Sequence, residues 1–253
     1  MEERIESPHN PLLVHIRKLQ SSRSYREKSG QFAADGTKLL AEAARWFPGL
    51  RTVVAQEGVP LCPLPDAVRV ARVTPALMKS VSLMEAPQGA VFVCELPPER
   101  PARVQPGSLL LDGIQDPGNL GTILRTADAL EIPAVLLDGC ADPWNPKTVR
   151  ASMGAVFRTL PAQISADEAV RLCRKAGIRL YAAAMSADAR DLREVPLRGA
   201  AVIVGSEGQG VSAGLLEAAD GKLVIPMNPR CESLNAAAAA AIVLWQMKNS
   251  VNP

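Results

Sequence analysis

Three segments in the second half of the chain place reactive or hydrogen-bonding side chains beside glycines, prolines and small residues, as ligand-binding turns do. They are LLLDGIQDPGNLGTILRTADAL at Leu109–Leu130, AVIVGSEGQG at Ala201–Gly210 and LVIPMNPRCESLNAAAAAAIVLWQ at Leu223–Gln246. Their polar groups are two carboxamides, a guanidinium, a carboxylate and a hydroxyl, at Asn119, Asn235, Arg125, Glu207 and Ser233. Such a set can hold a phosphate and orient a hydroxyl group.

The first segment predicts a buried strand that leads through a turn into a helix. The strand ends at Asp112, Pro117-Gly118 is expected to form the turn, and Asn119 takes the N-cap position. The core-facing stripe of the helix is formed by Leu120, Ile123, Leu124 and Ala127. Arg125 falls off this stripe, so we expect it to face solvent or substrate. A plain surface arginine paired with Asp128 would show the same spacing.

The second segment predicts an apolar strand that runs directly into a glycine-rich loop. Glycines at positions 205, 208 and 210 let the backbone approach a ligand closely. Their spacing, G-x-x-G-x-G, differs from the G-x-G-x-x-G of dinucleotide-binding folds, which disfavours a nicotinamide-dependent dehydrogenase. Glu207 in the loop is either a catalytic or orienting carboxylate or a solvated acid of the turn.

The third segment predicts a strand ending at Ile225-Pro226, a polar loop and a helix that opens with six alanines. The small side chains allow a helix or a ligand to approach closely, and they also have high helix propensity. Ser233 is a candidate for the N-cap of this helix, a role that is compatible with contact to a substrate.

The pattern of strands and helices indicates two α/β domains. Leu96–Gly107 contains four prolines and a glycine, which disfavour both helix and sheet, so we interpret it as a linker. We therefore predict a small α/β domain at residues 1–96, a linker at 97–107 and a larger domain at 108–253. The small domain is expected to have helices at 11–19, 37–46 and about 75–80, and strands at 31–34, 50–55, 68–70 and 90–94. In the larger domain, short apolar strands alternate with helices, which predicts a mainly parallel sheet with ligand-binding loops at the carboxyl ends of its strands. The predicted strands are at 108–111, 134–137, 179–183, 200–204 and 222–225, and the predicted helices are at 120–130, 147–155, 167–176, 212–219 and 234–248.

Composition and charge narrow the class of protein. The 253 residues are 47% hydrophobic and 21% charged, with a net charge of +2, and the sequence has no apolar run long enough to span a membrane. Residues 1–20 carry charges throughout in place of a signal peptide's apolar stretch, so we expect a cytoplasmic protein. The five cysteines form no C-x-x-C pair, so we expect reduced thiols and no zinc site. Residues 10–30 are basic, through Arg17, Lys18, Arg23, Arg26 and Lys28. This stretch either faces phosphates or is a solvated helix surface.

Together, the three segments resemble the motifs of the SpoU (TrmH) family of RNA 2′-O-ribose methyltransferases, in the SPOUT superfamily. The Asn119–Arg125 helix, the GSEG loop and the IPM…ESLN segment occur in the family's order, and the similarity covers about residues 108–248. HNPLLVHIRKLQ and FAADGTKLL are similar to the family's substrate-binding domain. Two departures are Asp35-Gly36, where the family usually has Glu-Gly, and the alanines after Asn235, where it often has Val-Ser-Val-Ala.

The resemblance implies a fold and a cofactor. The fold would be a C-terminal parallel-sheet SPOUT domain with a deep trefoil knot, plus a small N-terminal α/β sandwich that resembles a ribosomal protein. A homodimer would pack through the knotted region, with the catalytic pocket near that interface. The cofactor would be S-adenosyl-L-methionine, held largely through main-chain groups and apolar contacts at Gly205, Ile225 and Leu234, with Met227 nearby. No metal is expected.

The resemblance also implies RNA as the substrate, with catalytic or substrate-positioning roles for Asn119, Arg125, Glu207, Ser233 and Asn235. Ribosomal RNA, most of all 23S rRNA, is favoured over tRNA by the separate N-terminal domain. Alternatives are a tRNA 2′-O-methyltransferase, a base-methylating SPOUT enzyme and a non-catalytic RNA-binding protein that retains the fold. The intact set of five residues favours an enzyme over the last of these.

Methyl transfer from a sulfonium is an in-line displacement, so sulfur, methyl carbon and ribose oxygen must be aligned and water excluded. A guanidinium is a poor base. We therefore expect Arg125 to clamp a phosphate and orient the hydroxyl, with the proton passing to the RNA phosphate or to Ser233.

Overall fold

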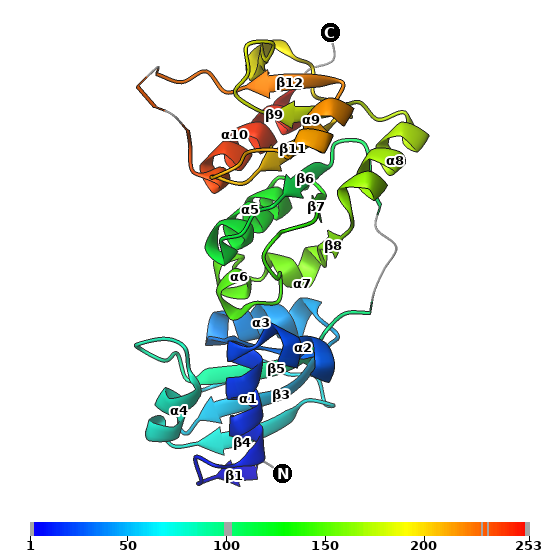
Figure 1. Cartoon of the computed structure of the whole chain (residues 1–253). Helices are drawn as coiled ribbons and strands as arrows, with labels where there is room; N and C mark the ends of the chain where they lie inside the picture. Colours follow the sequence, from blue (N-terminus) through cyan, green and yellow to red (C-terminus); the bar gives the residue numbers. More distant parts are fainter. Residues whose placement is uncertain (1–2, 99–102, 229, 232, 251–253) are drawn as a thin grey trace. The chain divides into compact units, whose positions relative to one another are not determined.

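The computed structural model describes residues 3–98, 103–228, 230–231 and 233–250 (Figure 1). The chain forms two compact units, the first made of Met1–Pro98 and Trp144–Arg158 and the second of Glu99–Pro143 and Thr159–Pro253. Residues 144–158 thus belong to the first unit, whereas the sequence pattern predicts them within the domain at 108–253. Part of the predicted linker, residues 99–102, lies outside the described residues.

The first unit contains a five-stranded mixed sheet of order β1-β4-β3-β5-β2. Its strands are β1 (Glu3–Ile5), β2 (Gln31–Asp35), β3 (Leu50–Gln56), β4 (Arg69–Val73) and β5 (Ala90–Glu95). Its helices are α1 (Pro11–Ser21), α2 (Arg23–Ser29), α3 (Thr37–Trp46), α4 (Pro75–Val81), α6 (Pro146–Ala151) and α7 (Ala155–Thr159). β3 and β4 are parallel, whereas β5 is antiparallel to both β2 and β3.

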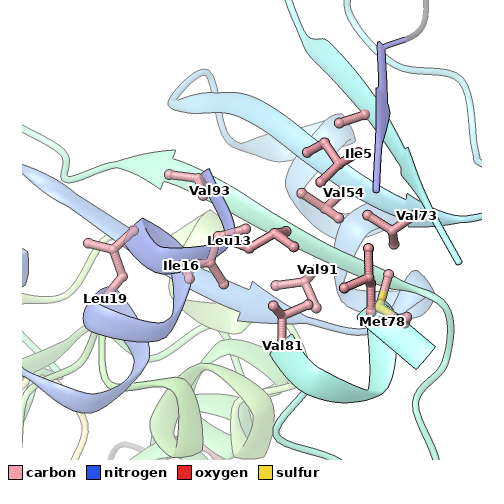
Figure 2. Close-up of a cluster of buried hydrophobic side chains, with 13 residues drawn as sticks. Ile5, Leu13, Ile16, Leu19, Val54, Val73, Met78, Val81, Val91 and Val93 are labelled. Carbon is pink, nitrogen blue, oxygen red and sulfur yellow. The ribbon is translucent and has the colours of Figure 1, made fainter. Parts of the chain in front are cut away.

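Alternating side chains divide this sheet between two apolar layers. On one face, Val91 and Val93 of β5 pack with α1 and α4 in a buried cluster (Figure 2). On the other face, Phe92 lies against Phe157 of α7, with ring centroids 6.3 Å apart. Phe157 also packs with Phe32 and Phe47, and both of these rings contact Trp144. This aromatic cluster explains why residues 144–158 fold with the first unit.

Asp35, at the end of β2, is a buried structural residue with 6% of its surface exposed. One carboxylate oxygen, Oδ2, accepts hydrogen bonds from Ser82 Oγ at 2.6 Å and from the backbone N–H of Leu83 at 2.8 Å. The other, Oδ1, is buried without a hydrogen-bond partner. Desolvation by burial raises the pKa of this carboxyl, against the lowering effects of Ser82, Leu83 and Arg150.

The second unit contains a seven-stranded sheet of order β10-β12-β9-β11-β6-β7-β8, in which every pair is parallel. Its strands are β6 (Leu109–Asp112), β7 (Ala134–Leu136), β8 (Ala162–Gln163), β9 (Leu180–Ala183), β10 (Arg190–Asp191), β11 (Ala201–Gly205) and β12 (Gly221–Val224). Its helices are α5 (Pro117–Ala129), α8 (Ala166–Ala176), α9 (Ala213–Ala218) and α10 (Ala236–Asn249), with a 3-10 turn η1 (Leu192–Glu194). The predicted α/β class with a parallel sheet is confirmed.

Helices cover both faces of this sheet. Ala169 and Cys173 of α8 and Leu215 of α9 are buried against one face, in a cluster that includes Leu110 and Ile203. α10 packs against α5 and β11 (Figure 1). Strands buried on both sides need continuous apolar runs, which explains the sequences LLL in β6 and AVIV in β11.

Three local predictions are wrong. Asp116, rather than Asn119, is the N-cap of α5: its side chain accepts from the backbone N–H of Asn119 at 2.8 Å, and Pro117 fits the first helical position. Asn235, rather than Ser233, caps α10. The helix predicted at 147–155 is interrupted, because Met153 and Gly154 adopt positive φ between α6 and α7.

Candidate functional site

A cavity of about 370 Å³ lies at the carboxyl ends of β9, β11 and β12, which are neighbours in the sheet. Its apolar wall includes Val204, Val211, Leu216, Leu223, Ile225, Met227 and Leu234. Its polar lining includes Ser206, Glu207, Gln209 and Ser233. This is the position at which a parallel sheet is expected to bind its ligand.

The GSEG loop is shaped by a close approach of two stretches of backbone. Ser206 and Gly210 exchange backbone hydrogen bonds of 3.2 and 3.0 Å, which folds residues 206–210 into a closed turn. A Cβ atom at Gly205 would overlap the carbonyl group of Gly210 and the backbone nitrogen of Val211, so no side chain fits at position 205. Gly210 itself has φ +67°, a conformation that favours glycine.

Asp112 fixes the far end of this loop. It lies at the end of β6, paired in register with Gly205 of β11. Its Oδ2 accepts the backbone N–H of Ser212 at 2.7 Å, and its side chain is buried. The carboxylate therefore ties the end of one strand to the loop that leaves the next.

A chain of hydrogen bonds joins the three segments that the sequence analysis singled out. Asn235 Oδ1 accepts the backbone N–H groups of Ala237 and Ala238, at 2.9 and 3.3 Å. Its amide Nδ2 donates to Asn119 Oδ1 at 3.2 Å, and Asn119 Nδ2 donates to Glu207 Oε1. The helix amides fix which way Asn235 points, Asn235 then fixes Asn119, and Asn119 presents its donor to the carboxylate.

The structure brings eight of the nine predicted site residues together. Gly205, Glu207, Ile225, Met227, Ser233 and Leu234 line the cavity. Asn119 and Asn235 are joined to that lining through Glu207. Arg125 lies elsewhere, on the exposed face of α5.

Arg125 borders a second, more open depression, between α5 and α10. This depression has a volume of about 520 Å³ and is lined by Arg125, Thr126, Ala129, Leu130, Ala241, Ile242 and Trp245. Trp245 is 63% exposed and Ile242 41% exposed, so large apolar side chains lie open on this face. We refer to these seven residues as the α5–α10 face.

Two contributions to the cavity were not predicted. Ala183, Ala184 and Met185, at the end of β9, line it. Asp112 positions the loop without lining the cavity. Both had a signal in the sequence, since an aspartate ended a buried apolar strand and β9 was itself predicted as a strand of the same parallel sheet.

The lining suits an organic ligand with apolar and polar parts. Apolar side chains dominate it, and the glycine-rich loop brings backbone groups to its edge. Among the described residues, no group of three or more His, Cys, Asp or Glu side chains is placed to hold a metal ion. All five cysteines are free, and burial raises the pKa of the Cys140 thiol to about 11, so this thiol is protonated at neutral pH. Within the described residues, no helix is long and apolar enough to cross a membrane.

Two family models match the chain, in the same order as its two predicted domains. Residues 107–245 match the SpoU rRNA Methylase family. Residues 10–91 match the MRM3-like substrate binding domain.

One named relative and one solved structure match almost the whole length of the chain, and a second relative matches about half of it. The 23S rRNA (guanosine(2553)-2′-O)-methyltransferase RlmP of Bacillus subtilis is 34% identical over 250 residues, which cover 97% of this chain and 99% of that protein. The tRNA (guanosine(18)-2′-O)-methyltransferase of Thermus thermophilus is 38% identical over 143 residues, or 55% of this chain. An AdoMet-bound rRNA methyltransferase structure from Sinorhizobium meliloti has a TM-score of 0.86 at 28% identity and covers 99% of each chain.

Proposed function

The chain belongs to the SpoU rRNA methylase family, and we propose that it transfers a methyl group from S-adenosylmethionine to a ribose 2′-hydroxyl of 23S ribosomal RNA. The observation that carries this proposal is the hydrogen-bonded chain Asn235–Asn119–Glu207 beside an apolar cavity lined by Gly205, Ile225 and Leu234. The ribosomal substrate is supported by the relative named for 23S rRNA, which aligns along both units. An rRNA substrate also agrees with the prediction of a cytoplasmic protein.

The residues around the cavity fit S-adenosylmethionine. Ile225, Met227 and Leu234 would supply apolar contacts, and the turn at Gly205 would supply backbone groups close to the ligand. When bound, S-adenosylmethionine supplies a methyl group that is open to in-line attack by an oxygen atom.

The protein's own residues would align and polarise the attacking ribose. Glu207 lines the cavity, and Asn119 holds one of its carboxylate oxygens, so the carboxylate has a fixed orientation toward the substrate. Ser233 adds a hydroxyl to the same lining. Together they would orient the 2′-hydroxyl, and its proton would pass to the RNA phosphate, either directly or through the Ser233 hydroxyl as a relay.

Arg125 would complete the site of a second copy of this chain. Its guanidinium lies on the α5–α10 face, whose exposed Ile242 and Trp245 support burial against an identical face in a homodimer. In that dimer, Arg125 would reach the RNA bound at the partner's cavity, clamp a phosphate and orient the hydroxyl.

The reaction is tested by incubating the purified protein with tritiated S-adenosylmethionine and either unmodified 23S rRNA or tRNA. We expect label in 23S rRNA on a ribose. Mapping of ribose methylation in a strain that lacks the gene then identifies the nucleotide. Label in tRNA alone would replace the proposed substrate with the alternative that the Thermus thermophilus relative suggests. Label in neither RNA, with cofactor binding intact, would contradict both.

Arg125→Ala tests the assignment of the guanidinium. We expect turnover to be lost while S-adenosylmethionine affinity, measured by calorimetry, stays near that of the unchanged protein. The physical reason is that Arg125 is exposed on α5 and lies outside the cavity lining. Arg171→Ala, which removes an exposed arginine of α8, is the control. An active Arg125→Ala enzyme would remove this residue from the mechanism.

The trefoil knot of the family is also proposed for this chain. In support, β12 pairs with β9 on the side away from β11, and α10 then returns to pack against β11 and α5. Pulling the two termini of a single molecule apart tests this arrangement. A knotted chain stops extending at a contour length shorter than that of 253 residues, whereas an unknotted chain reaches the full length.

A further inference from the structure

Four cations gather at the edge of the large sheet that lies opposite the cavity. Arg174 and Lys175 are in the last turn of α8, Arg179 directly precedes β9, and Arg198 lies just before β11. All four side chains are exposed. We call these four residues the amino-edge cluster, because they stand where the strands begin, whereas the cavity lies where they end.

Backbone contacts show that the segments carrying these cations are neighbours. The backbone N–H of Ala201 in β11 donates to the carbonyl of Arg179 at 2.8 Å. The backbone N–H of Ile178 donates to the carbonyl of Cys173 at 2.9 Å, which folds the end of α8 back toward β9. In Figure 1, α8 lies on the side from which the chain enters β6 and β9. The segments that carry the four cations therefore lie side by side at the same end of the sheet.

The positive charge of this surface is largely uncompensated. Within the described part of the chain, none of the four side chains forms an ion pair. Two carboxylates lie by the cluster, and both have other partners. Glu168, on which Lys175 acts electrostatically, is paired with Arg171 at 2.6 Å, and Asp220 Oδ2 accepts the backbone N–H of Leu180 at 2.7 Å.

A purely structural role explains only half of the cluster. Arg174 and Lys175 complement the negative end of the α8 dipole, as cations in a last helical turn commonly do. Arg179 and Arg198 stand in connections between elements, where no helix end requires them. The turns beside them contain Gly177 and Gly199, both at positive φ, and a Cβ at Gly177 would meet no atom within 4 Å. Both glycines are exposed, so these turns leave the neighbouring cations accessible to solvent.

We propose that the amino-edge cluster binds the phosphate backbone of the substrate RNA, at a place separate from the nucleotide that is methylated. The inference rests on the proposed function, since it assumes an RNA substrate. Guanidinium groups bind phosphates in a bidentate manner, and an exposed set of them supplies affinity without sequence preference. The five residues of β11 set the cluster about 15 Å from the cavity edge, a separation that a folded RNA segment spans.

The test compares two triple variants of the full-length protein that lose the same charge. R174Q/R179Q/R198Q neutralises three arginines of the cluster. R171Q/R193Q/K222Q neutralises three cations of the same unit that are held in ion pairs with Glu168, Asp191 and Asp188. Binding of each protein to deproteinised 23S rRNA transcribed in vitro is measured by filter retention between 50 and 200 mM KCl.

At 50 mM KCl, the cluster variant should bind 23S rRNA at least about tenfold more weakly than the control variant does. Its slope of log affinity against log salt concentration should be shallower than that of the control by about 2 to 3. Its affinity for S-adenosylmethionine and its kcat at saturating RNA should match those of the control. Equal salt slopes for the two variants would overturn the inference. A defect seen with ribosomal particles but not with naked RNA would also overturn it, in favour of a protein partner. Failure of the unchanged protein to methylate any RNA would count against the proposed function instead.

Discussion

Gly205 is the residue at which the cavity depends most directly on the absence of a side chain. It ends β11, and the backbone of Gly210 and Val211 occupies the space that a Cβ would need. The closed turn of residues 206–210 therefore packs against the strand that precedes it. Gly208 lies in the same turn, but a Cβ there would meet no atom within 4 Å. A side chain can therefore be added at Gly208 and not at Gly205.

Gly205→Ala is expected to lower S-adenosylmethionine affinity at least about tenfold, a loss of about 1.4 kcal/mol, because the turn must move away from the strand to admit a methyl group. Gly208→Ala, which meets no atom within 4 Å, should bind as the unchanged protein does. Isothermal titration calorimetry measures both. Equal affinities would show that the turn does not shape the cofactor site.

The buried carboxyl of Asp35 should make the stability of the first unit depend on pH. Its pKa is raised in the folded protein, so its contribution to stability is full in acid, below the ordinary aspartate value, and is lost as pH rises through the raised pKa. Asp35→Asn does not ionise. The free energy of unfolding of the variant minus that of the unchanged protein should therefore be more positive at pH 8 than at pH 4.

Urea denaturation at the two pH values measures this difference. Asp66→Asn, which removes an exposed carboxylate from the same unit, is the control and should show no such trend. A difference for Asp35→Asn that is independent of pH, or that shrinks as pH rises, would contradict the assignment of Asp35 as a buried acid disfavoured in its charged form.

At the scale of residues, types and spacing predicted most of the side chains that gather around the candidate site. The GSEG and ESLN segments were singled out from sequence, and the structure places Gly205, Glu207, Ser233 and Leu234 around one cavity. The exposed position of Arg125 followed from its offset from the apolar stripe of α5, and it is confirmed. The bond between Asn119 and Glu207 was beyond prediction, because it joins side chains that are 88 positions apart and depends on the sheet order.

Among the elements, α10 has two roles, because its N-cap residue, Asn235, also belongs to the candidate site. Asn235 accepts two backbone N–H groups of the helix and donates to Asn119. Helix stability and substrate positioning can be separated by substitution, since the first needs only the acceptor oxygen and the second needs the amide donor.

Asn235→Asp should keep the cap and lose the donor, so that stability stays within about 0.5 kcal/mol while kcat falls strongly. Asn235→Ala should lose both, with about 1 kcal/mol less stability. Chemical denaturation and a methyl-transfer assay measure the two properties. Ser165→Ala, which removes the N-cap of α8, should lose stability and retain kcat. Full activity in Asn235→Asp would remove the amide donor from the mechanism.

Element boundaries followed closely from periodicity where capping chemistry was unambiguous. The helix predicted from Pro11 ends two residues later than expected, and α3 spans Thr37–Trp46 as predicted. α5 was predicted to begin too late, because Pro117-Gly118 was read as a turn when proline also fits the first position of a helix. The short edge strands β1, β8 and β10 were not predicted, since two or three residues show no periodicity.

For the whole molecule, the α5–α10 face is the feature that predicts association of two copies of the chain. Leu130 and Ala241 line it together with the exposed Ile242 and Trp245, which leaves a hydrophobic surface on helices that also border the site. A knotted fold and a dimer lie outside what periodicity can predict, because both depend on chain path and on a second molecule.

Trp245→Glu should convert the proposed dimer to a monomer, since it places a charge at the centre of a buried apolar contact. Methylation should fall as well, because Arg125 would no longer reach a partner's cavity. Analytical ultracentrifugation measures the mass in solution. Trp46→Glu, at an exposed tryptophan of the first unit, is the matched control and should leave the mass unchanged. A dimeric Trp245→Glu protein would place the interface elsewhere.

The hydrogen-bonded link from Asn235 through Asn119 to Glu207 also bears on the order in which the candidate site forms during synthesis. The ribosome delivers position 119 first, then 207, and the opening turn of α10 last. Until α10 docks, Asn235 cannot hold Asn119, and the link to Glu207 is incomplete. If this link serves methyl transfer as proposed, a nascent chain would stay inactive toward RNA until translation has passed α10.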